Sequence, residues 1–193
     1  MKRILLMLSL LAGAAHAQEA TVVKEQIISD KANAGWSFGG EVKLKEVEAA
    51  GLPGGKAVQA RVPKKGQNPW DIQASLPMQL GIEKGDQLTF GFYARAVEPD
   101  PGKETASIHI RFQRKAAPYD AALEGPIEIG RDWRFYCLAG PSTLSLAAAD
   151  FTISVQLAAD KRVLEFGPYL ATRIAGGGAT RKSGLPCGEK LGS

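Results

Sequence analysis

Three segments of the chain, residues 86–97, 107–113 and 151–157, alternate between apolar and polar residues. Strict alternation is typical of half-buried β-strands. If the three strands lie in one sheet, their polar positions share one surface: Tyr93, Arg95, His109, Arg111, Gln113, Thr152, Ser154 and Gln156. Guanidinium and amide groups offer the angular hydrogen bonds that sugar hydroxyls require, and aromatic rings pack on flat sugar faces. This mixture suits carbohydrate binding, but alternation alone favours the simpler interpretation, a solvated outer face without a function.

The three tryptophans and Gln73 are the remaining candidates for such a surface. Trp70 lies an even number of residues from Ile72 and Leu76, so alternation places it in the core. It lies near the start of the strand, however, where a following loop can turn the ring outward. Gln73 follows Trp70 in the same segment and is a further candidate. Trp133 precedes a strand and is interpreted as a structural residue, whereas Trp36 lies among glycines and fits either role. A tryptophan in a small sandwich is more often a core residue than a ligand platform.

Signatures of catalysis and of metal binding are sparse. The chain has no Gly-x-Ser-x-Gly and no His-Glu-x-x-His, and the polar faces hold no pair of carboxylates for glycoside hydrolysis. Residues 176–183 resemble a phosphate-binding loop, but Arg181 replaces its second glycine, so we discard that interpretation. His109 is the single histidine after residue 17, which argues against a zinc site. We expect no catalytic residue, no metal and no cofactor.

Nine segments read as strands, separated by Gly, Pro, Asn and Asp. They are residues 41–47, 56–62, 70–76, 86–97, 107–113, 126–129, 133–138, 151–157 and 163–172. Many short strands at this spacing, with no helix pattern, predict an all-β fold in which two antiparallel sheets form a β-sandwich, or jelly roll. The sequence places this single domain at residues 18–174. Residues 175–193 form a Gly-rich C-terminal tail that we expect to be mobile.

The N-terminus predicts export. Lys2 and Arg3 precede an apolar run, and Ala15-His16-Ala17 supplies small residues for cleavage before Gln18, so residues 1–17 form a signal peptide. The apolar run is too short to cross a bilayer, and no later segment is apolar enough. The net charge of +4 loses two of its cations with the signal peptide. We expect a periplasmic or extracellular protein without a membrane span and without a nucleic-acid partner.

Export to an oxidising compartment also bears on the two cysteines. Cys137 and Cys187 form an even pair in an exported chain, and such a pair more often forms a disulfide than a site. Alternation groups Cys137 with Trp133 and Phe135, which predicts that its side chain points inward. Because Cys187 lies in the Gly-rich tail, the bond would attach that tail to the domain.

Several motifs, in their order, resemble carbohydrate-binding modules of families four and nine and their galactose-binding-like relatives. They are residues 68–73 (NPWDIQ), 85–86 (GD), 88–96 (LTFGFYARA), 133–136 (WRFY) and 163–168 (VLEFGP). The resemblance covers about residues 35 to 171. It implies a jelly roll that binds polysaccharide in a groove on one sheet without cleaving it, as an appendage of secreted xylanases and glucanases. Gly167-Pro168 stands where the family often has an Asp pair, which argues against its structural calcium ion.

The resulting hypothesis is a non-catalytic exported protein that binds a polysaccharide or oligosaccharide. Its expected ligand-binding residues are Tyr93, Arg95, Arg111, Gln113, His109, Gln156, Gln73 and Trp70. A glycoside hydrolase on another chain is the expected partner. Two alternatives stay open, namely a jelly-roll enzyme such as a polysaccharide lyase, with His109 or Tyr93 as base, and a structural envelope protein without a glycan ligand.

Overall fold

The structure of the chain is a computed structural model that describes residues 24–30, 35–176 and 181–191. The predicted signal peptide, residues 1–17, lies outside these residues. The strands are β1 (Glu25–Ile27), β2 (Phe38–Gly39), β3 (Lys43–Glu48), β4 (Lys56–Val62), β5 (Gln73–Pro77), β6 (Gln87–Glu98), β7 (Ala106–Arg114), β8 (Ala121–Ile129), β9 (Arg134–Pro141), β10 (Phe151–Gln156) and β11 (Arg162–Ile174). Two short 3₁₀ helices, η1 (Pro69–Asp71) and η2 (Ala148–Asp150), complete the described elements. No helix within the described ranges has the length and apolarity that crossing a membrane requires.

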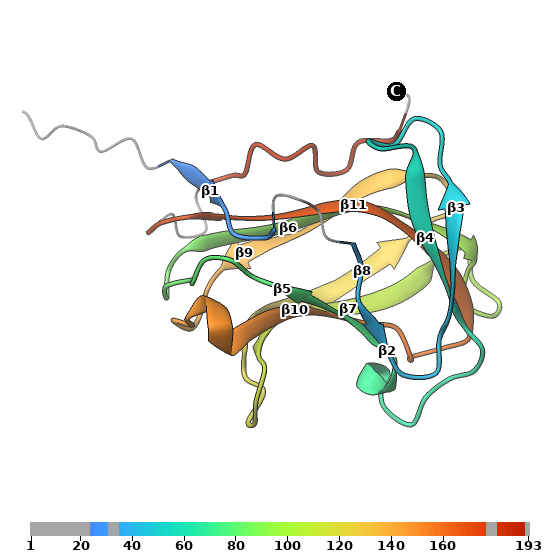
Figure 1. Cartoon of the computed structure of the whole chain (residues 1–193), viewed down its shortest axis with the longest axis horizontal. Helices are drawn as coiled ribbons and strands as arrows, with labels where there is room; N and C mark the ends of the chain where they lie inside the picture. Colours follow the sequence, from blue (N-terminus) through green and yellow to red (C-terminus); the bar gives the residue numbers. More distant parts are fainter. Residues whose placement is uncertain (1–23, 31–34, 177–180, 192–193) are drawn as a thin grey trace, which may run out of the picture.

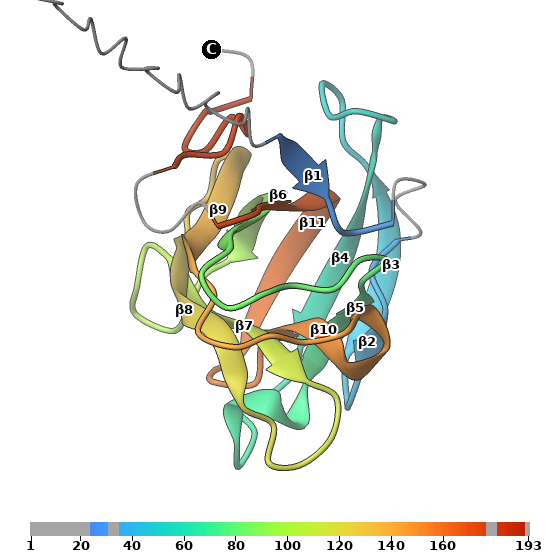
Figure 2. The same ribbon diagram turned by 90° about the vertical axis from the view of Figure 1, so that its left-hand side faces the viewer.

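The strands form two sheets that pack face to face, as Figures 1 and 2 show. The six-stranded sheet has the order β3-β4-β11-β6-β9, with β1 also paired to β11. The five-stranded sheet has the order β2-β5-β10-β7-β8. Every pairing between neighbouring strands is antiparallel. The predicted antiparallel β-sandwich is therefore confirmed.

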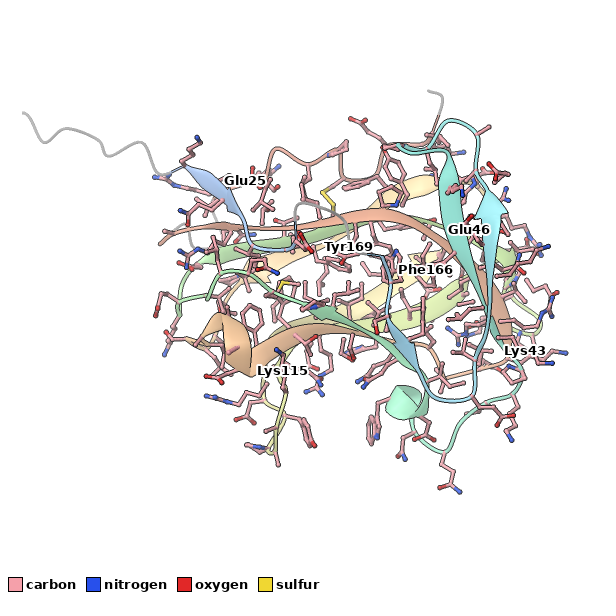
Figure 3. The ribbon with its side chains drawn as sticks, in the orientation of Figure 1. Glu25, Lys43, Glu46, Lys115, Phe166 and Tyr169 are labelled. Carbon is pink, nitrogen blue, oxygen red and sulfur yellow. A yellow bond between two sulfur atoms is a disulfide. The ribbon has the colours of Figure 1, made fainter. Side chains whose placement is uncertain are left out.

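The core lies between the sheets and follows from the alternation in the sequence. Apolar positions of β6, β7 and β10 point inward: Leu88, Phe90, Phe92, Ile108, Ile110, Phe112, Phe151, Ile153 and Val155 are all fully buried or nearly so. Phe166 of β11 joins them, and Figure 3 shows its ring between the layers. Trp36 belongs to the same core, because its ring packs 4.7 Å from that of Phe166 and its Nε1 donates to the carbonyl of Gly167. Each of these large side chains contributes about 1.5–3 kcal/mol by its burial.

The disulfide between Cys137 and Cys187 is present, which confirms the prediction. The expected direction of Cys137 is wrong, because Tyr136 and Leu138 are the β9 residues that pack on the main core. Cys137 faces the outer side of the six-stranded sheet, where the C-terminal segment crosses it (Figure 1). Residues 181–191 are not a free tail, since the backbone of Phe135 exchanges hydrogen bonds with Gly188 and Glu189.

We predict that Cys187→Ser releases the C-terminal segment while the sandwich stays folded. The bond spans 50 residues, and the chain-entropy estimate for such a loop is roughly 4 kcal/mol of stability. Trypsin should then cut after Arg181 or Lys182 much faster than in the unchanged protein, as peptide mass spectrometry would show. Equal digestion of the two proteins, without a shift in the guanidinium unfolding midpoint, would contradict this prediction.

Candidate carbohydrate-binding groove

The outer face of the five-stranded sheet collects most of the residues singled out in the sequence. In the paired strands, His109 of β7 lies opposite Gln156 of β10, which lies opposite Gln73 of β5. Arg111 lies opposite Ser154 in the next row, and Gln113 lies opposite Thr152. Since residues directly opposite each other share a face, these rows form one continuous polar floor.

Tyr93 and Arg95 do not belong to this floor. Their strand, β6, pairs with β9 and β11 in the six-stranded sheet, so the condition that all three alternating segments share a sheet is not met. Alternation defines the two faces of a strand but carries no information on its neighbours. Tyr93 instead packs edge-on against Phe135, and the Arg95 guanidinium lies 5.1 Å from the centre of the Trp133 ring.

Two adjoining hollows lie over the polar floor, and together we call them the groove. The first, of about 440 Å³, is lined by Trp70, Gln73, Arg111, Gln113, Pro118, Tyr119 and Gln156. The second, of about 520 Å³, is lined by Pro69, Trp70, Asp100, Lys103, Ser107, Ile108, His109, Arg111, Glu124, Pro126, Gln156, Ala159, Asp160 and Arg162. Six of the eight predicted ligand-binding residues therefore lie along one groove. A third hollow, of about 520 Å³, lies at the β3–β4 margin and contains none of the eight.

Trp70 forms one wall of the groove from a turn and not from a strand. Pro69, Trp70 and Asp71 form the helix η1, whose start is capped by Asn68 and Asp71. The backbone N–H of Asn68 donates to the Asp71 carboxylate at 2.9 Å, and this hydrogen bond lowers the pKa of Asp71. Alternation with Ile72 predicted a core position, but the strand begins only at Gln73. Trp70 therefore lies outside the alternating segment and is 54% exposed.

Tyr119 lines the same hollow as Trp70 and was missed in the sequence. It lies in the loop between β7 and β8, which projects from the five-stranded sheet and carries Lys115, labelled in Figure 3. Its side chain is 49% exposed. An aromatic residue next to Pro118 in a segment without strand alternation was the available signal. Alternation within strands carries no information on a loop residue.

The floor of this hollow offers amide groups that are not fully hydrogen-bonded among the described residues. The Ser154 hydroxyl donates to Gln73 Oε1 at 2.6 Å, which leaves the Gln73 amide N–H groups for a ligand. Gln113 is only 8% exposed, and its Oε1 has no hydrogen-bond partner among the described residues. Because a buried acceptor without a partner costs about 1–3 kcal/mol, this oxygen favours a ligand or water that donates to it.

Glu124 of β8 adds a carboxylate that the sequence analysis did not place on the groove. Its Oε2 accepts from Arg111 Nε at 2.7 Å and lies 3.3 Å from His109 Nε2. Burial tends to raise the pKa of Glu124, but the hydrogen bonds from His109 and Arg111 and the charge of Arg111 together lower it below its ordinary value. Glu124 is therefore ionised at neutral pH and is a poor proton donor.

A buried ion pair closes the far end of the groove. Arg162 and Asp100 are 1% and 3% exposed, and Arg162 Nη2 lies 3.2 Å from Asp100 Oδ1. Arg162 Nη1 also donates to the carbonyl of Ser107, so the pair attaches the loop after β6 to β7. The ammonium group of Lys103 lies 3.7 Å from Asp100 Oδ2 and is largely exposed. The described residues contain no cluster of His, Cys, Asp and Glu side chains that could hold a metal ion.

No protein-family model and no curated protein sequence matches the chain. Its fold does match solved structures. The second N-terminal cellulose-binding domain of β-1,4-glucanase C from Cellulomonas fimi is 17% identical, with a TM-score of 0.56 over 77% of this chain and 92% of that one. A CBM4 structure is 15% identical, with a TM-score of 0.53 over 78% of this chain and 94% of that one. The CBM22-1 xylan-binding domain of Xyn10C from Paenibacillus barcinonensis is 12% identical, with a TM-score of 0.50 over 79% of this chain and 94% of that one. At these identities the likeness establishes the fold, so the chain has the jelly roll of these carbohydrate-binding modules.

We predict that Arg95 stabilises the six-stranded sheet. Its Nε donates at 2.6 Å to Glu165, which is 3% exposed and otherwise accepts from Gln59. Arg95→Met removes one partner of a buried carboxylate and should lower the free energy of unfolding by about 1–3 kcal/mol. The matched control is Arg61→Met, which breaks an exposed pair with Glu98 and should cost less than about 1 kcal/mol. Equal losses in urea unfolding would contradict this role for Arg95.

Proposed function

We propose that this protein binds a polysaccharide chain in the groove and does not cleave it. The observation that carries the proposal is the pairing of two exposed rings, Trp70 and Tyr119, on one hollow whose floor holds Gln73, Gln113 and Gln156. Aromatic rings pack on the apolar faces of pyranose rings, and side-chain amides match their hydroxyls as donors and acceptors. Concave sites with aromatic walls and a few convergent polar groups are typical of ligand binding.

The charges in the groove favour an uncharged glycan. Arg111 is paired with Glu124, and Arg162 is paired with Asp100. Lys103 also lies beside Asp100, and Asp160 adds another carboxylate to the lining. The cations of the lining are therefore matched by acids, and a polyuronate would have to compete for them. A neutral polysaccharide meets no such cost.

Binding without cleavage is better supported than a lyase activity. The lyase hypothesis needs a base beside groups that neutralise a uronate carboxylate. Tyr93, one of its two candidate bases, lies on the other sheet, and Arg111 already neutralises Glu124. His109 remains in the groove but lies beside the same carboxylate.

The proposed setting is outside the cytoplasm. A disulfide is consistent with an oxidising compartment, and the signal peptide predicted at residues 1–17 would direct export. We propose that the protein acts beside a glycoside hydrolase on another chain, to which it would supply contact with the polysaccharide.

We predict that Trp70→Ala and Tyr119→Ala each weaken glycan binding about 10-fold, in the range usual for a central aromatic contact. Affinity electrophoresis in soluble xylan, mixed-linkage β-glucan and hydroxyethylcellulose would measure the loss, with pull-down on insoluble cellulose and peptidoglycan. Leu44→Ala removes an exposed apolar side chain of β3, which belongs to the other sheet and does not line the groove, and should leave retardation unchanged.

Two results would contradict the proposal. The first is that the unchanged protein shows no binding to any of these glycans at millimolar site concentration. The second is new absorbance from unsaturated chain ends on incubation with alginate or pectin, which would instead identify a lyase.

A further inference from the structure

The guanidinium of Arg111 connects the floor of the groove to its Tyr119 wall. Its Nη2 donates to the backbone carbonyl of Tyr119 at 3.2 Å, while its Nε donates to Glu124 at 2.7 Å. The Arg111 side chain is mostly buried. Two of its five N–H groups are thus directed at the protein, one toward β8 and one toward the loop that carries the ring.

The backbone of Tyr119 needs such a connection. Its φ of 59° lies in the left-handed region, and Tyr119 is the one non-glycine residue with positive φ among the described residues. A side chain other than glycine is strained in this conformation, which persists only where surrounding contacts hold it. The Tyr119 N–H donates to the carbonyl of Ala116 within the loop. The bond from Arg111 reaches its carbonyl from the sheet.

We propose that Arg111 is a positioning residue, which sets the affinity of the groove by holding the Tyr119 ring at the hollow that Trp70 also lines. This inference rests on the proposed function, because it assigns a role within the same groove. Arg111 acts on the ligand through Tyr119. Glu124 in turn holds Arg111, and His109 lies on the other side of the shared carboxylate oxygen.

The geometry requires a guanidinium. Its planar fork directs Nε and Nη2 at two acceptors that lie on different elements, β8 and the β7–β8 loop. A lysine ammonium is a point charge on a flexible stem and does not reproduce this pair of directions. Arg111→Lys should therefore lose the connection between Glu124 and the Tyr119 carbonyl, although it preserves the charge.

A double-mutant cycle separates positioning from direct contact. The probe is whichever of soluble xylan, mixed-linkage β-glucan or hydroxyethylcellulose the unchanged protein binds. Arg111→Met and Arg111→Lys should each weaken binding about 5- to 10-fold in the original chain and less than about 2-fold when Tyr119 is already alanine. An equal loss in both backgrounds would show that Arg111 contacts the ligand independently, and would overturn the proposal.

Hydrogen exchange tests the same role without a ligand, so that its outcome is independent of the proposed function. The N–H groups of Lys115 and Tyr119 are hydrogen-bonded, to Asp150 and Ala116, and report on the loop. In Arg111→Met and Arg111→Lys, exchange should accelerate in residues 115–120 at least about 5-fold, while β6 and β10 keep their protection. Arg61→Met, on the other sheet, should change none of these rates. Unchanged exchange in the loop, or acceleration throughout the sandwich, would overturn the positioning role whether or not a glycan binds.

Discussion

The inward packing of the aromatic and aliphatic side chains between the two sheets is the constraint on which the groove depends. Phe112 of β7 and Ile153 of β10 are directly paired and fully buried. Because side chains alternate with a period of two, a slip of one residue would turn every polar group of a strand into the core. Burial of these inward residues therefore also fixes the register of the outward ones, so that His109, Gln156 and Gln73 form a row on the opposite face.

The outer faces of the two sheets differ in whether other segments cover them, and this explains why similar residues have different roles. The outer face of the six-stranded sheet is covered by the β3–β4 connection, where Leu52 is buried, and by the C-terminal segment, where Leu191 packs against the same small cluster. Arg95 and Tyr93 are consequently partners of protein groups. The face of the five-stranded sheet has no such cover within the described residues, which leaves its arginine and amides at the lining of a hollow.

The sequence predicted which face of each strand is buried, but it did not predict which strands pair with each other. Alternation gave the faces of β6, β7 and β10 correctly, and the two cysteines gave the disulfide. Sheet membership could not be predicted, because the pairing of β6 with β11 and β9 is a non-local choice that leaves no mark on the alternation of β6 itself. Tyr119 and Glu124 were missed for related reasons. Tyr119 lies in a loop. Glu124 lies in β8 directly before Gly125 and Pro126, two residues that interrupt the alternation by which a strand is recognised.

Both walls of the groove are built from turns, while its floor is built from strands. Trp70 depends on the Asn68–Asp71 cap of η1, and Tyr119 depends on its left-handed backbone and on Arg111. A turn held by a few hydrogen bonds can change its ring or its spacing without disturbing the buried core, whereas a change in the floor must respect the register of three strands. Holding the rings in place before binding also reduces the ordering cost that a ligand must offset. In the proposed glycan-binding role, the selectivity of the groove for chain shape would depend on the two turns, and its hydrogen-bonding character would depend on the sheet beneath them.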